Sequence, residues 1–266
     1  MKQIQLLLYL IFTFFNAQSQ INYGPRITAM GGAGVALQDV WSVQKNQAGI
    51  AALKTPTASL AYENRYLIKE ISTKSAAFAI PVSKYVIGAA FQSYGVNAYN
   101  ETRGGLSLAR AFSPKLLTAI SVNYHQIQVS NYGNAQAVSV EVGIQYQALK
   151  NLWLAAHIAN PNSSKFGNNT DQIIPAHIQF GGSYTFSDKL IISTEFEKIL
   201  DRQADFKTGL EYKVIKAFAL RGGVSMNPFK QYAGFGIELQ DLLFDFGISS
   251  HPILGYSPQI SLGYEF

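Results

Sequence analysis

The sequence predicts an all-β fold, an antiparallel transmembrane β-barrel of fourteen strands with an N-terminal plug segment in the lumen. Three observations lead to this fold class. From Thr57 onward, apolar and polar residues alternate with the period of two that strands have. Charged residues make up 14% of the chain and aromatic residues 13%, and the mean hydropathy is near zero, which suits a wall between lipid and lumen. The last segment, residues 257–266, alternates in the same way and ends on an aromatic residue.

Residues 1–19 are predicted to be a signal peptide. Lys2 gives a positive start, residues 4–15 are mostly apolar, and Ala17-Gln18-Ser19 resembles a small-residue cleavage site. A membrane anchor is the alternative, but the apolar run is shorter than the roughly 20 residues that a spanning helix needs. We therefore expect an exported protein whose mature chain starts at Gln20. Because no later run of 18 residues is wholly apolar, this chain has to span a membrane with strands.

Residues 20–56 precede the first predicted strand and form the predicted plug. The motif residues of this segment are Arg26, Met30, Gly31, Gly32, Gly34, Asp39, Asn46 and Gly49. A nucleotide-binding loop is the alternative for Gly31-Gly32-x-Gly34, but its spacing does not match the dinucleotide or Walker patterns. Glycines that let one backbone pass close to another are the favoured interpretation.

The predicted barrel covers residues 57–266. Its strands are expected near 57–64, 72–82, 86–95, 103–112, 116–129, 135–147, 152–159, 175–186, 189–198, 204–214, 217–225, 231–240, 242–250 and 257–266. Connections after even-numbered strands are tight, such as 83–84, whereas those after odd-numbered strands are longer, such as 94–102 and 160–174. This alternation predicts short periplasmic turns and longer outer loops. A soluble β-sandwich is the alternative, and it predicts no such asymmetry.

Charged residues of the later strands alternate with the apolar residues, so they are expected to point into the lumen. A basic residue that faces lipid costs about 2–4 kcal/mol at mid-bilayer. The predicted lumen residues are Glu195, Glu197, Lys207, Glu211, Lys213, Arg221, Glu238, Asp245 and Glu265. Arg221 should lie beside Glu211, with Glu238 as a candidate partner on its other side. Because the two signs are mixed, a structural ladder of ion pairs is favoured over a charged path for a substrate.

Several inward positions of the predicted wall are glycines, which leave room in the lumen for the plug. They are Gly143, Gly181, Gly209, Gly223, Gly234, Gly236, Gly247 and Gly263.

The C-terminal segment predicts the destination of the chain. Ile260, Leu262, Tyr264 and Phe266 alternate with polar residues and glycine, a pattern that resembles the insertion signal of outer-membrane barrels. We therefore expect the outer membrane as location, its lipid as surroundings and the barrel-insertion machinery as a partner during biogenesis. This strand must pair with the first strand, near residues 58–63, to leave no exposed edge.

Residues 26–51 resemble the start of FadL-like and PorV/PorQ-like outer-membrane barrels of Bacteroidota. Those barrels typically read R-x-x-x-M/L-G-G-A-x-V-A, then D-x-x-S/A, then N-P-A-G-L-A, and this chain follows the same order. Residues 174–184 resemble a second family feature, the entry of a central strand. The resemblance implies a fourteen-stranded barrel with an N-terminal plug. Two departures are that Gln47 stands where the family usually has proline and that the outer loops are shorter than is typical.

Catalysis, cofactors and metals have little support in the sequence. The chain has no cysteine, and no H-E-x-x-H, G-x-S-x-G or metal-ligand spacing occurs. A barrel phospholipase would need a Ser–His pair at the outer lipid interface, but His125, Ser121 and Asn123 share the inward face. Lysine and arginine are scattered, so no nucleic-acid partner is expected.

Three functions follow from these observations. The main interpretation is a non-enzymatic barrel resembling PorV/PorQ that serves protein export or surface assembly, with another envelope protein complex as a candidate partner. The alternative is a FadL-like passive channel for small hydrophobic compounds. The third, a lipid-modifying enzyme, is the least favoured.

Overall fold

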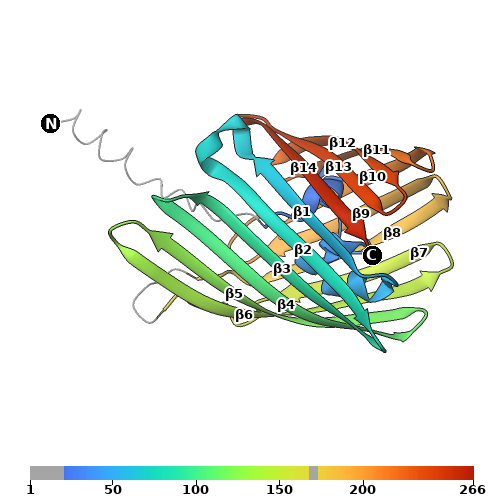
Figure 1. Ribbon diagram of the computed structural model, residues 1–266, viewed down its shortest axis with the longest axis horizontal. Helices are drawn as coiled ribbons and strands as arrows, with labels where there is room; N and C mark the ends of the chain where they lie inside the picture. Colours follow the sequence, from blue (N-terminus) through green and yellow to red (C-terminus); the bar gives the residue numbers. More distant parts are fainter. Residues whose placement is uncertain (1–20, 168–172) are drawn as a thin grey trace.

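The computed structural model describes residues 21–167 and 173–266 of the 266-residue chain (Figure 1). The predicted signal peptide, residues 1–19, lies outside the described residues. The described residues form fourteen strands, each hydrogen-bonded to the next along the chain, and β14 closes on β1 to make a barrel. Every strand pair is antiparallel, as predicted. Within these residues, no helix is both long enough and apolar enough to cross a membrane.

The strand boundaries agree with the alternation in the sequence to within a few residues. The strands are β1 (Thr57–Asn64), β2 (Ser72–Val82), β3 (Tyr85–Val96), β4 (Tyr99–Ser113), β5 (Leu116–Val129), β6 (Gly133–Leu149), β7 (Leu152–Ala159), β8 (His177–Ser187), β9 (Leu190–Ile199), β10 (Asp205–Ile215), β11 (Phe218–Met226), β12 (Phe229–Leu239), β13 (Leu242–His251) and β14 (Gly255–Glu265). The largest difference is at β4, which begins at Tyr99 rather than near residue 103.

The predicted difference in length between the two kinds of connection is only partly correct. Connections after even-numbered strands are tight turns, such as 83–84 and 150–151. The connection predicted over 94–102 is a tight turn at 97–98, because β3 and β4 continue through most of that range. The sequence of these strand ends resembles that of a loop because Ser93, Gly95 and Asn100 stand at outward positions where apolar residues are expected. The longest connection is 160–176, which contains the residues that are not described.

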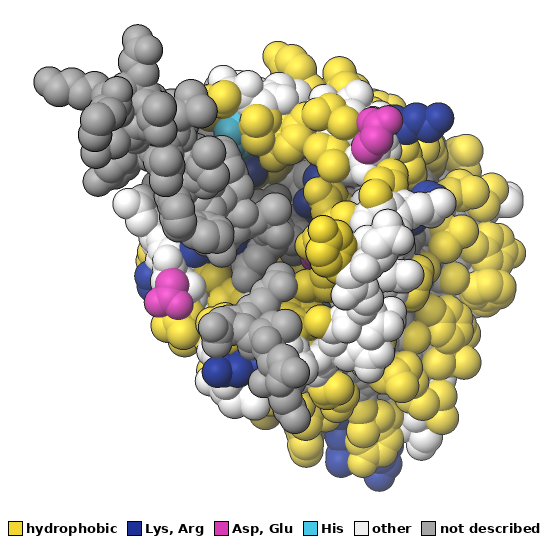
Figure 2. Space-filling model, turned by 90° about the vertical axis from the view of Figure 1, so that its left-hand side faces the viewer, with side chains coloured by type: hydrophobic (Ala, Val, Ile, Leu, Met, Phe, Trp, Pro, Cys, Tyr) yellow, Lys and Arg dark blue, Asp and Glu magenta, His cyan; other side chains and the backbone are white. Residues whose placement is uncertain are grey.

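The outside of the wall is apolar, as a lipid-facing surface requires. Side chains of one parity are exposed along most strands, and Figure 2, which looks at one end of the barrel, shows hydrophobic side chains on the part of the outer surface in view. The exposed set includes Ile260, Leu262, Tyr264 and Phe266, the predicted insertion signal. The predicted closure is confirmed: β14 pairs with β1, with Ala58 opposite Tyr264 and Glu63 opposite Gln259. Closure leaves no unpaired strand edge for the lipid to meet.

The N-terminal segment lies inside the barrel (Figure 1). Its elements are α2 (Gly24–Ala29), η1 (Val40–Gln44) and η2 (Gln47–Ala52). Asp39 begins η1 by accepting a hydrogen bond from the backbone N–H of Ser42, and Asn46 begins η2 by accepting one from Ala48. Two further turns, η3 (Arg65–Leu67) and η4 (Lys69–Ile71), connect β1 to β2.

The core lies between this segment and the wall. Ile27, Met30 and Ile50 of the segment are fully buried, and inward alanines of the wall, such as Ala79 and Ala109, pack in the same cluster. Small inward residues are needed there because a fourteen-stranded wall must leave space for the chain that fills it. We call residues 21–56 the plug.

Candidate functional site

Inward glycines of the wall let the plug backbone touch it directly. A Cβ atom at Gly209 would lie 2.2 Å from the carbonyl oxygen of Met30, and one at Gly223 would lie 2.3 Å from the backbone nitrogen of Gly31. Gly31 has φ +70°, a conformation that favours glycine. The predicted use of inward glycines, to leave room for the plug, is found at Gly143 and Gly234 as well, which face Asn46 and Ala29. We call the contact of Met30–Gly31 with Gly209 and Gly223 the seam.

The plug residue Arg26 joins Asp39 of the plug to Glu211, one of the predicted lumen carboxylates. Its guanidinium lies 2.9 Å from Asp39 Oδ2 and 2.9 Å from Glu211 Oε2. Burial alone would lower the pKa of Arg26, but Glu211 and Asp39 outweigh it and hold that pKa above its ordinary value. Arg26 therefore stays charged, and it fixes both α2 and the start of η1 to β10.

Arg221 extends this network around the wall. Its Nε lies 2.6 Å from Glu211 Oε2, as the sequence predicts, and its Nη1 lies 2.5 Å from Asp245 Oδ1. The prediction of Glu238 as the second partner is wrong, because Arg221 reaches across β12 to Asp245 instead. The absence of a side chain at Gly236 makes this possible, since a Cβ there would lie 2.3 Å from Arg221 Nη2.

A second cluster surrounds Glu195, which is 1% exposed. Its Oε1 lies 2.7 Å from Lys45 Nζ, and its Oε2 accepts hydrogen bonds from the backbone N–H groups of Gly34 (3.0 Å) and Val35 (2.9 Å). The neighbouring Glu197 is paired with Lys207 and lies 2.5 Å from His177 Nε2. Gly34 of the motif is thus held by a wall carboxylate.

A third cluster surrounds Glu141 on β6, which is also buried. Its Oε1 lies 2.6 Å from Arg103 Nη2, its Oε2 accepts a hydrogen bond of 2.6 Å from Gln47 Nε2, and His157 Nε2 lies 3.3 Å away. Gln47 is the residue that replaces the usual proline, so here the departure from the family pattern binds the wall. Sequence reasoning missed Arg103 and Glu141, although the parity rule applied to β4 and β6 would have found them. Lys45 lies in irregular backbone, where no periodicity points to it.

The remaining residues singled out in the sequence have structural positions. Asn46 Nδ2 donates to the carbonyl oxygen of Val35 at 2.8 Å, and a Cβ at Gly49 would lie 2.5 Å from the carbonyl oxygen of Leu37. Gly32 has φ +77°. Lys213, Glu238 and Glu265 lie at the turn end of the lumen. These contacts bring most of the predicted plug motif together with the predicted lumen charges.

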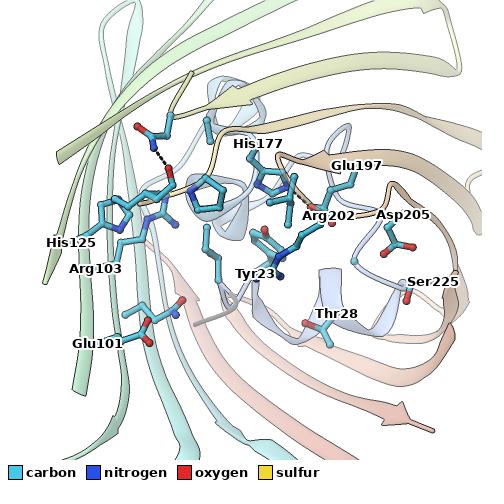
Figure 3. Close-up of a pocket in the computed structure, with 18 of the residues that line it drawn as sticks. Tyr23, Thr28, Glu101, Arg103, His125, His177, Glu197, Arg202, Asp205 and Ser225 are labelled. Carbon is cyan, nitrogen blue, oxygen red and sulfur yellow. Dashed lines mark hydrogen bonds and ion pairs between the residues drawn. The ribbon is translucent and has the colours of Figure 1, made fainter. Parts of the chain in front are cut away.

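Among the described residues, the lumen holds a larger and a smaller chamber, each lined in part by the plug. The larger, of about 610 Å³, lies on the side of the long connection; Figure 3 shows Tyr23 and Thr28 of the plug among its lining residues, with Arg103, His177 and Glu197 of the wall. The smaller, of about 210 Å³, lies on the turn side and is lined by Arg26, Asp39 and Glu211 among others. Along β10, Lys207 lines the larger chamber and Glu211 the smaller, and the seam at Gly209 lies between them.

One part of the larger chamber is formed by apolar side chains, although most of the residues that line the chamber are polar or charged. Ile127 and Phe166 are buried in one cluster, with Ile174 packed against it. All three line the chamber.

A serine–histidine pair also lines the larger chamber, but it lacks the third member of a catalytic site. His125 Nε2 lies 2.8 Å from Ser139 Oγ on the neighbouring strand, a partner that sequence reasoning missed in favour of Ser121. Among the described residues, no carboxylate is hydrogen-bonded to His125 to orient its ring. The pair faces the lumen rather than the lipid, where a lipid-modifying enzyme would need it.

No family model matches the chain, and no curated protein matches it. Several solved structures are similar to this chain in fold. A structure described as the CymD monoaromatic hydrocarbon channel is 13% identical, with a TM-score of 0.72 over 91% of this chain and 97% of that one. The Ralstonia pickettii toluene transporter TbuX is 15% identical, with a TM-score of 0.70 over 95% and 100%. A FadL homologue of Pseudomonas aeruginosa is 10% identical, with a TM-score of 0.62 over 94% and 99%.

At these identities the likeness concerns the fold. One of these structures is described as a FadL homologue, which agrees with the FadL-like part of the resemblance in the sequence. The PorV/PorQ-like part has no such support. The shared fold and the apolar outer wall agree with the predicted location in an outer membrane.

Proposed function

We propose that this chain is a passive channel of the outer membrane for small hydrophobic compounds. The observation that carries the proposal is the larger chamber, whose apolar side of Ile127, Phe166 and Ile174 lies in the lumen of a closed barrel. Neighbours of the same fold are described as a monoaromatic hydrocarbon channel and a toluene transporter, which supports a solute of similar size and polarity.

The apolar side supplies the driving force for uptake. Moving apolar surface from water to an apolar environment is favourable by about 25 cal/mol per Å². A small aromatic compound that enters the larger chamber loses water on this apolar side. It leaves the charged side undisturbed, because Glu141 and Glu197 there are already paired with Arg103 and Lys207. Passage to the smaller chamber then needs the plug to move from the seam.

The main interpretation of the sequence, a component of protein export or surface assembly, is less well supported than this alternative. The solved structures named above are channels and transporters. The tight connections at 97–98 and 227–228 also leave little surface for a large partner on those sides of the outer end. A lipid-modifying enzyme would need an acid beside His125.

Uptake by intact cells tests the proposal, because toluene dissolves in simple liposomes without a channel. Cells that express the full chain should take up radiolabelled toluene faster than cells that lack it. The variant Ile127→Asn should lower the rate, since it places an amide in the apolar side. Ile253→Asn, the same change at a residue that is 87% exposed in the β13–β14 turn, is the matched control and should leave the rate unchanged.

Liposome swelling with a small sugar tests the barrier in the same protein. Wild type should give little swelling because the plug separates the chambers, and deletion of residues 21–52 should raise it. The channel would be contradicted if neither form admitted the sugar and the full chain did not speed the uptake of toluene.

A further inference from the structure

Arg110 of β4 carries a positive charge on the lipid-facing side of the wall. It follows Leu106 and Leu108 with the same outward parity, and both of those leucines are exposed. Its cross-strand partner is Tyr85 on β3. The guanidinium carbon lies 5.3 Å from the centroid of the Tyr85 ring and 4.6 Å from that of Phe112, so two aromatic rings hold it against the outer surface.

Arg110 has no anionic partner in the part of the chain that the structure describes. Among residues 21–167 and 173–266, no carboxylate forms an ion pair with it, and its Nε has no hydrogen-bond partner. Its Nη1 lies 3.4 Å from Tyr85 Oη, which is a long contact. An arginine cannot lose its proton in a protein, and a charge at a lipid-facing position is costly without a partner. The described residues therefore leave the charge of Arg110 without a compensating anion.

The place of Arg110 along the strand indicates which anion this is. Tyr85 and Phe112 are both exposed near the turn end of the wall, where aromatic residues mark the level of lipid head groups. Lys84 directly precedes Tyr85 in the β2–β3 turn, and Lys115 lies in the β4–β5 turn. Three basic residues thus lie at the same end of the wall, on the neighbouring strands β3 and β4 and the turns beside them.

We propose that Arg110, Lys84 and Lys115 bind the phosphate of an anionic phospholipid in the leaflet on the turn side of the barrel. A guanidinium presents paired N–H groups that match two phosphate oxygens, and the lysines add charge around it. Leu106 and Leu108 continue from Arg110 toward the middle of the wall, where the acyl chains of the same lipid would lie. This site is independent of any solute in the lumen.

Lipid binding by the purified full-length barrel tests the site. Native mass spectrometry of the protein in detergent would count bound phosphatidylglycerol, with phosphatidylcholine as the zwitterionic comparison. Arg110→Gln removes the charge. Lys74→Gln is the matched control, because Lys74 is an exposed, outward basic residue of β2 toward the other end of the wall.

Wild type and K74Q should bind phosphatidylglycerol in preference to phosphatidylcholine, and R110Q should bind it about fivefold more weakly, the effect of one basic residue near a lipid surface. Millimolar inorganic phosphate should not displace the lipid; displacement together with loss of the preference for phosphatidylglycerol would mean a site for free phosphate and overturn the proposal. Equal binding by wild type and R110Q would overturn it as well. If R110Q does not fold, the double variant K84Q/K115Q, in exposed turns, should show the same weakening.

Discussion

Replacing Gly209 by alanine should force the plug away from the wall. The new Cβ would lie 2.2 Å from the carbonyl oxygen of Met30 and 2.5 Å from its carbonyl carbon. Both atoms are backbone, so no side-chain rotation can relieve the contact. Overpacking of this kind costs about 1–3 kcal/mol. The relief available is a shift of Met30–Gly31 from the seam, which would join the chambers of about 610 Å³ and 210 Å³.

Two measurements check this prediction. Urea unfolding of the barrel in detergent should show G209A destabilised by about 1–3 kcal/mol, and liposome swelling with a small sugar should rise above wild type. Gly104→Ala is the matched control, because Gly104 is also in a strand and a Cβ there meets nothing within 4 Å. If G209A matches G104A in both measurements, the seam is not the barrier and the reasoning from backbone contact is refuted.

Three further predictions concern the plug and the C-terminus. Lys45→Met should destabilise the barrel by about 3–5 kcal/mol in urea unfolding, because it removes the nearer cation of the buried Glu195, at 2.7 Å, and leaves only Lys207 at 3.9 Å; in an E195Q background the loss should be smaller. Gln47→Leu should cost about 1.5–3 kcal/mol in the same assay, since it removes a hydrogen bond to the charged Glu141. Phe266→Ser should slow assembly into the membrane in a pulse-chase experiment without lowering the stability of barrels that have formed, because Phe266 is exposed at the end of the wall.

The wall could be predicted almost completely from the sequence because its period is simple. Each residue of β6 from Val138 to Tyr146 takes the face that its polarity indicates, and the same holds for β14. The prediction was wrong at 94–102, where a hairpin continues with small and polar residues on its outward side. Contact with lipid is the reason that outward residues are apolar and inward residues polar. Where a strand extends beyond the lipid, its outward residues need not be apolar, so the alternation no longer marks the strand.

The plug could be located in the sequence, but its contacts could not. Arg26 and Asp39 stood out through the family resemblance, and the structure shows why they belong together, since they form an ion pair. Lys45 and Gln47 carried no comparable signal, because irregular backbone gives no period from which to read the direction of a side chain. Their partners, Glu195 and Glu141, lie about 100 residues or more away along the chain, and only the closure of the barrel brings them near.

The glycines of β12 explain why the lumen charges form a structural network rather than a path for charged solutes. Gly234 admits Ala29 of the plug, and Gly236 admits the guanidinium of Arg221, which then reaches Asp245 on β13. With β12 lacking inward side chains at these two points, one chain of ion pairs runs from the plug through Glu211 to β13. Each carboxylate of that chain is already bound to an arginine, so none is left to attract a cation from solution. The network therefore favours uncharged solutes, which agrees with the apolar side of the larger chamber.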